Sequence, residues 1–178
     1  MTELLIRLFV RDYRNTEQPQ VRERYGKFAG IVGIVSNLLL FAMKAITGLV
    51  TGSISIIADA VNNLSDSASS VITLVGFKLS GKPADEEHPY GHARIEYISG
   101  LIVSFLILLL GVQLLQESIN KIITPEETVF NPAAVLVLVL SCLIKAWQSF
   151  FYRKVGRKIS SPTIEATAAD SRSDVIST

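Results

Sequence analysis

Three apolar stretches in this chain are long enough to cross a lipid bilayer as α-helices. They cover residues 28–50, 97–115 and 132–152. A helix rises about 1.5 Å per residue and the hydrocarbon core of a membrane is about 30 Å thick, so about 20 apolar residues span it. Hydrophobic residues make up 49% of the 178 residues, which is typical of a small protein with several membrane spans. The sequence therefore predicts a chain that folds within a membrane.

Two further segments have helical patterning but are more polar. Residues 54–80 are expected to form a helix after a tight turn at residues 51–53, and another helix is expected to begin at Thr163. We therefore predict an all-α polytopic membrane helix bundle, with four full spans and the start of a fifth.

The net charge of +1 hides an uneven distribution of lysine and arginine along the chain. These residues gather before the first span, between the second and third spans, and before the fifth, whereas the other two loops contain only Lys121. The basic residues of the three segments are Arg7, Arg11, Arg14, Arg22, Arg24, Lys27, Lys78, Lys82, Arg94, Arg153, Lys154, Arg157 and Lys158. Because basic loops stay on the cytoplasmic side, we expect a multi-pass protein of the bacterial plasma membrane with a cytoplasmic amino terminus.

Residues 1–27 come before the first span and are charged throughout. Apolar residues recur among the arginines at helical spacing, namely Leu4, Leu5, Leu8 and Phe9. This pattern predicts a short amphipathic helix on the membrane surface, and a solvated tail is the alternative. We therefore divide the chain into a cytoplasmic amphipathic segment, residues 1–27, and a transmembrane domain, residues 28–178.

Two pairs of oxygen-bearing side chains lie inside the predicted helices. Asn62 and Asp66 are four residues apart, as are Asp170 and Asp174, so each pair projects from one helix face. A buried aspartate costs about 2.5–3.5 kcal/mol in the middle of a span and needs a cation, a proton or water. Counting the helical rise from each membrane surface places Asp66 level with Asp170, and Asn62 level with Asp174. The sequence therefore predicts a metal or proton site near the midplane, with polar helix packing as the alternative.

The donor atoms of these four residues are all suited to a hard cation. Oxygen ligands are preferred by six-coordinate ions such as magnesium and manganese(II), whereas zinc and copper favour thiolate and imidazole ligands. Oxygen ligands alone do not exclude zinc, because most sites bind zinc more tightly than manganese.

Three motifs together resemble the cation diffusion facilitator family of metal transporters. They are ADAVNNLSDSASS, KPADEEHPYGHARIEYISG and EATAADSRSDV, and the resemblance covers nearly the whole chain. It implies that Asn62, Asp66, Asp170 and Asp174 are the four ligands of the transport site. Zinc exporters of the family generally have histidine where this chain has Asp170. The set of one asparagine and three aspartates therefore resembles the manganese-exporting branch.

The resemblance implies a homodimeric antiporter that exports manganese(II) in exchange for protons. The metal would be its cargo, and no cofactor is expected. Three carboxylates around one site repel one another, so protons are expected to bind there when the metal leaves. The alternatives are export of zinc, cadmium, iron or cobalt, a passive cation or proton channel, and a truncated membrane fragment that does not transport. An enzyme or a nucleic-acid-binding protein is not predicted, because the chain has no phosphate-binding glycine loop and its basic residues follow the membrane topology.

A second group of candidate ligands lies in the loop before the third span, and contains Asp85, His88 and His92. In zinc-transporting members of the family these positions can bind a second metal. The alternative is that these side chains fold the turn or cap the helix that follows.

Three further charged residues lie within the predicted spans, and the sequence does not assign them a function. Asp59 is seven residues before Asp66 and is expected either to line the outer vestibule or to be a water-exposed residue at a helix start. Lys44 is expected to extend to the membrane interface. Lys145 is deeper, and it either pairs with a buried carboxylate or extends inward.

The family resemblance also implies parts that this sequence does not contain. Its members have six spans and a cytoplasmic carboxy-terminal domain that binds metal and helps the protein to dimerise. This sequence ends at Thr178, only 16 residues into the predicted fifth helix. We therefore expect it to be part of a longer protein.

Overall fold

The computed structural model describes residues 2–10, 12–123 and 131–177, and Arg11 and Thr178 lie outside these ranges. All regular structure in the described residues is helical, which confirms the predicted all-α class. The helices are α1 (Thr2–Phe9), α2 (Pro19–Thr51), α3 (Ile54–Ser80), α4 (Ile95–Ile123), α5 (Pro132–Ile159) and α6 (Pro162–Ser177).

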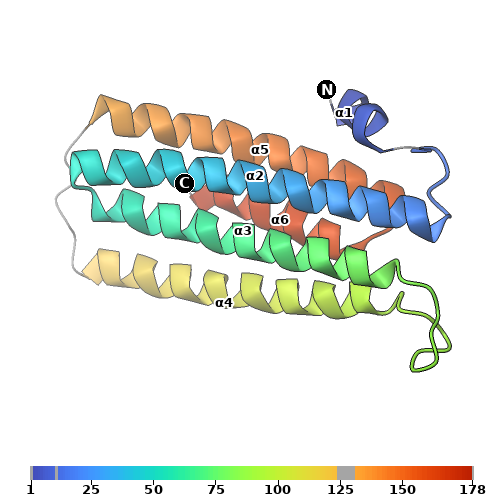
Figure 1. Cartoon of the computed structure of the whole chain (residues 1–178). Helices are drawn as coiled ribbons and strands as arrows, with labels where there is room; N and C mark the ends of the chain where they lie inside the picture. The colour runs from blue at the N-terminus through green and yellow to red at the C-terminus, as the bar shows by residue number, and fades with distance from the viewer. Residues whose placement is uncertain (1, 11, 124–130, 178) are drawn as a thin grey trace.

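The long helices lie side by side along a common axis (Figure 1). Contacts join α2 to α3, α3 to α4, α4 to α6, α6 to α5 and α5 back to α2. These five helices therefore form a closed ring. Because α6 is only 16 residues long, it follows about half the length of its neighbours (Figure 1).

Within the described ranges, three helices are long and apolar enough to cross a membrane, namely α2, α4 over residues 95–120, and α5. With 27 residues, α3 has the length of a span, but its polar residues lower its hydropathy. Those residues face the interior, where Asp66, Ser69, Ser70 and Thr73 are all buried. A helix with polar residues on its inner face and Val61, Leu64, Val71 and Val75 exposed suits the inside of a membrane bundle.

Two helices extend beyond the predicted spans. Helix α2 begins at Pro19, nine residues before the expected start at residue 28. Proline is favoured at the first position of a helix because its φ angle is already helical and the N–H that it lacks has no intrahelical partner there. Helix α5 continues to Ile159, so most of the predicted basic linker is helical. Lysine and arginine are good helix formers, and the apolar sequence pattern alone did not show that the helix continues.

Small residues let α2 approach α3 and α5 closely. A Cβ atom added at Gly30 would lie 2.7 Å from the Cβ atom of Leu74 on α3. A Cβ atom added at Gly33 would collide with the side chains of Ser70 on α3 and Tyr152 on α5. Glycine is common at such contacts in membrane bundles, where close packing holds the helices together.

Helix α1 forms within the segment that was predicted to be amphipathic, and the side chains of Leu4 and Leu5 lie outside those that the structure describes. Ile6 and the following Val10 are each only 1% exposed and join the core cluster, whereas Leu8 and Phe9 are largely exposed. The ring of Phe9 also stacks on Phe28, with ring centroids 5.2 Å apart. The amino-terminal segment therefore packs against the bundle.

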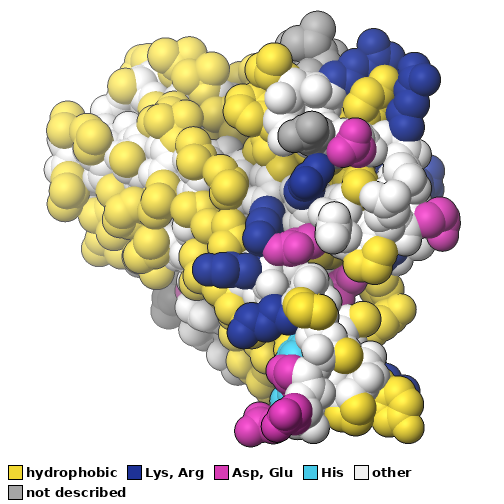
Figure 2. Space-filling view, turned by 45° about the vertical axis from the view of Figure 1, so that its right-hand side comes forward, with side chains coloured by type: hydrophobic (Ala, Val, Ile, Leu, Met, Phe, Trp, Pro, Cys, Tyr) yellow, Lys and Arg dark blue, Asp and Glu magenta, His cyan; other side chains and the backbone are white. Residues whose placement is uncertain are grey.

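Polar and apolar side chains occupy different parts of the surface. Hydrophobic side chains cover the left of Figure 2, and lysine, arginine, aspartate and glutamate gather at the right. The right-hand end carries the amino-terminal segment, the α3–α4 loop and the α5–α6 junction (Figure 1). Helix α4 contributes exposed Leu101, Phe105, Leu108 and Leu115 to the apolar part. Such a surface suits a protein embedded in lipid.

Candidate metal centre

Helix α3 provides the first part of the candidate site. It begins after Ser53, whose Oγ accepts a hydrogen bond of 3.4 Å from the backbone N–H of Ile56. Thirteen residues later on the chain, Asp66 is buried with 4% of its surface exposed. Asn62 lies one turn before Asp66 and is half-buried.

Helix α6 provides the second part and runs in the opposite direction to α3 (Figure 1). Its Asp174 is buried, and Asp170, one turn earlier, is half-buried. The Oγ1 atom of Thr163 donates a 3.0 Å hydrogen bond to the carbonyl oxygen of Glu96. This bond fixes the start of α6 against α4 and so sets the height of both aspartates in the bundle.

The three carboxylates meet inside the bundle. One oxygen from each of Asp66, Asp170 and Asp174 lies within 4.8 Å of the others. The structure therefore brings together three of the four residues that the sequence placed near the midplane, from the two helices expected. Oxygen donors at this separation can share a single hard divalent ion. Metal binding by these residues, and by Asn62, stays a prediction.

A fourth charged group, which the sequence analysis did not assign to the site, contacts two of these carboxylates. The Nζ atom of Lys145 on α5 donates hydrogen bonds to Oδ2 of Asp66, at 2.5 Å, and to Oδ2 of Asp174, at 2.7 Å. Lys145 is only 3% exposed. Of the two alternatives from the sequence, the structure supports pairing with a buried carboxylate. The sequence held a signal, because the polar residues Ser141, Lys145 and Gln148 follow helical spacing, and the structure buries all three.

The electrostatics of the group favour a cation. Three carboxylates and one ammonium give a formal excess of two negative charges inside the bundle. Buried charges are stable only when they are paired or coordinate an ion. In this arrangement Lys145 offsets part of the charge of the carboxylates.

Lys44 is the second buried lysine, and its predicted position was wrong. Lys44 was expected to extend to the membrane interface, but it is 1% exposed and its Nζ atom lies 2.6 Å from Oδ2 of Asp59. A buried ammonium needs a carboxylate partner, and Asp59 on the neighbouring helix α3 supplies one. Asp59 is seven residues, or about 10 Å along the helix, from Asp66. Lys44 and Asp59 therefore form a second ion pair, about two turns along α3 from Asp66.

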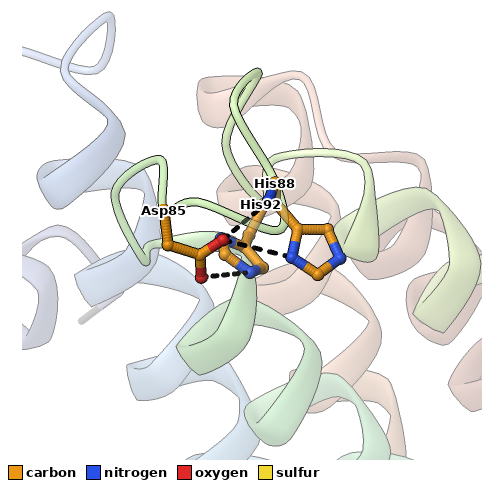
Figure 3. A group of neighbouring side chains, drawn as sticks. All are labelled: Asp85, His88 and His92. Carbon is orange, nitrogen blue, oxygen red and sulfur yellow. Dashed lines mark hydrogen bonds and ion pairs between the residues drawn. The ribbon is translucent and has the colours of Figure 1, made fainter.

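The second predicted group of ligands meets in the α3–α4 loop (Figure 3). Oδ2 of Asp85 lies 3.5 Å from Nε2 of His92, and Oδ1 lies 3.3 Å from Nδ1 of His88. The backbone N–H of His88 also donates a 2.7 Å hydrogen bond to Asp85, and this bond is the main cause of a lowered pKa for that carboxyl. The same three side chains therefore fold the turn and present ligand atoms within 4.8 Å of one another.

Comparison with known proteins gives a consistent set of relatives. Residues 30–178 match the family described as cation efflux transmembrane domain. An uncharacterised transporter of Methanocaldococcus jannaschii is 35% identical over 147 residues, which are 83% of this chain and 52% of the relative. The manganese efflux system protein MneS of Bacillus subtilis is 33% identical over 157 residues, 85% of this chain and 54% of the relative.

The magnetosome protein MamM of Magnetospirillum gryphiswaldense is 31% identical over 148 residues, 82% of this chain and 46% of the relative. The chain therefore spans about half the length of these relatives.

Proposed function

Because the chain belongs to the cation efflux family of membrane transporters, we propose that the whole protein exports manganese(II) in exchange for protons. The observation that carries this proposal is the meeting of Asp66, Asp170 and Asp174 inside the bundle. Carboxylates buried among membrane helices are expensive unless they serve an ion or proton pathway.

The donor set supports manganese as the cargo. The three aspartates and Asn62 offer oxygen atoms only, as hard divalent ions prefer. Two similar proteins of Bacillus subtilis are named manganese efflux system proteins. Zinc, cadmium, iron and cobalt are the competing cargoes, because oxygen ligands do not exclude them.

Proton exchange follows from the same cluster. When the metal leaves, the carboxylates repel one another, and binding protons relieves that repulsion. A metal that arrives from the cytoplasm would expel these protons. One group of side chains would thus bind the two ions in alternation.

In the proposed topology the protein lies in the plasma membrane of a bacterium, and the charged end of the bundle faces the cytoplasm. This end carries the basic residues of the amino-terminal segment, the α3–α4 loop and the α5–α6 junction (Figure 2). Basic segments next to spans are retained on the cytoplasmic side. We propose a homodimer as the working form of the whole protein, in line with the family resemblance.

We also propose that Asp85, His88 and His92 bind a second divalent ion at the cytoplasmic end. One atom from each lies within 4.8 Å of the others, and two imidazoles with one carboxylate suit zinc as well as manganese. This ion would be bound in a loop and would not lie on the transport path.

A metal-sensitivity panel tests the proposed function. The full-length protein is expressed in a bacterial host that lacks its own metal exporters, and growth is measured in manganese, zinc, cobalt, iron and cadmium. Protection against manganese above all is expected. Protection against zinc alone would show that zinc, and not manganese, is the cargo. Absence of protection against every metal would refute export.

A further inference from the structure

The ammonium group of Lys145 lies where a transported cation would bind. It is hydrogen-bonded to one oxygen each of Asp66 and Asp174, from helices α3 and α6, at 2.5 and 2.7 Å. The side chains of Lys145 and Asp66 are each 4% exposed and that of Asp174 is 10% exposed, so water does little to screen the contact. A lysine on α5 therefore bridges the two helices that supply the candidate metal ligands.

An ion and this ammonium cannot use the same oxygens together. Hard divalent ions bind oxygen ligands at about 2.0–2.6 Å, a separation that leaves no room for a second cation against the same lone pairs. Two cations this close would also repel each other strongly in a medium of low dielectric constant. A metal that takes these two oxygens as ligands therefore requires the Lys145 ammonium to move.

We propose that Lys145 is a built-in competitor for the transported metal, which holds the carboxylates between transport cycles and is displaced when the metal binds. This inference rests on the proposed function. It assigns Lys145 the role of setting affinity: the lysine weakens metal binding, and its return to the carboxylates assists release. Without the lysine, the site would hold its metal too tightly.

The displaced ammonium has an acceptor on its own helix. Gln148 lies three residues further along α5, on the same face, and is fully buried. Its Nε2 atom donates to Ser36, whereas its Oε1 atom has no hydrogen-bond partner among the described residues. A buried amide oxygen without a partner is unfavourable, and an ammonium that swings toward it would satisfy it. The lysine can thus leave the carboxylates and still be hydrogen-bonded.

Manganese binding to the purified full-length protein, measured by titration calorimetry, tests this role. The binding that Asp66→Asn removes defines the transport site. Lys145→Gln is expected to bind manganese about tenfold more tightly than the unchanged protein, because a nearby positive charge is lost. It should also transport more slowly at saturating metal. A residue that only supported the fold would weaken binding when replaced, so the direction of the change separates the two roles.

Lys44→Gln is the matched control. Lys44 is equally buried and paired with a carboxylate, but its partner Asp59 is about 10 Å along α3 from Asp66. Its loss should change manganese affinity by less than about threefold, since Coulomb interactions weaken with distance. An equal gain in affinity from both variants would overturn the specific role of Lys145.

Lys145→Arg decides the question if the glutamine variant does not fold. Its guanidinium keeps the charge and can bond both carboxylates in a fixed fork, so it should be harder to displace and should weaken manganese binding about threefold or more. Unchanged or tighter binding would overturn the inference. Failure of the unchanged protein to bind any metal at Asp66 would instead refute the proposed function.

Discussion

At the scale of single residues, the candidate site consists of three aspartates, two of which accept hydrogen bonds from Lys145. Aspartates are costly in a membrane helix, so Asp66, Asp170 and Asp174 are conspicuous in the sequence alone. Lysine is common near span ends, where it reaches the interface, and this made the role of Lys145 ambiguous. Only the packing of α5 between α2 and α6 shows that its ammonium meets Asp66 and Asp174.

Asp170 offers a test of metal selectivity at this scale. Asp170→His replaces one oxygen donor by an imidazole, which zinc prefers. We expect the ratio of zinc to manganese transport by the full-length protein to rise about tenfold, equivalent to about 1.4 kcal/mol. The measurement is competitive uptake of the two metals into vesicles. Asp170→Asn is the control, since it removes the charge without supplying a nitrogen ligand, and an equal shift in both variants would contradict the argument.

At the scale of helices and loops, the limits of α3, the end of α2 and the start of α5 were predicted from the sequence, whereas the start of α2 and the end of α5 were not. A turn at residues 51–53 marks the start of α3. The first turns of α2 and the last turns of α5 are polar. An apolar pattern does not show that a helix continues beyond the membrane into water. Close packing at glycine was also not predicted, because it depends on which helix lies opposite.

Helix packing at Gly30 gives a stability prediction. Gly30→Leu places a side chain where a Cβ atom alone would be 2.7 Å from Leu74, so α2 and α3 must separate. We expect a loss of about 1–3 kcal/mol in stability, seen as a lower melting temperature of the full-length protein in detergent. Gly111→Leu on α4 is the matched control, because a Cβ atom there meets nothing within 4 Å. Equal melting temperatures for the two variants would contradict the packing of α2 on α3.

The α3–α4 loop gives a prediction of pH dependence. The pKa of Asp85 is lowered mainly because its carboxylate accepts the His88 backbone N–H, so this contact stabilises the loop above the ordinary pKa of aspartate. The stabilisation should be lost as the pH falls through the lowered pKa. Amide exchange at His88, after correction for its intrinsic pH dependence, is expected to lose protection only in acid. In Asp85→Asn, protection should be weaker at neutral pH, and a loop with the same protection in both proteins would contradict this account.

At the scale of the whole molecule, counting helical rise from the membrane surfaces placed Asp66 level with Asp170, and the structure brings these two carboxylates into one group. It also brings Asp174 into that group, although the count had placed Asp174 level with Asn62. Counting from opposite surfaces applies because α3 and α6 run in opposite directions (Figure 1). It could not show that α6 also contacts α4 and closes the ring, since lateral order is set by side-chain packing. The same closed ring holds Lys145 against Asp66 and Asp174.

The most direct test of the central claim is manganese uptake into proteoliposomes that contain the full-length protein, with a proton gradient imposed across the membrane. The unchanged protein is expected to transport manganese and to move protons the opposite way, and Asp66→Asn is expected to stop both. Glu117→Gln, which alters a carboxylate on α4 that accepts a hydrogen bond from Gln113, should keep most of the transport. Transport that survives Asp66→Asn, or that ignores the proton gradient, would contradict the account.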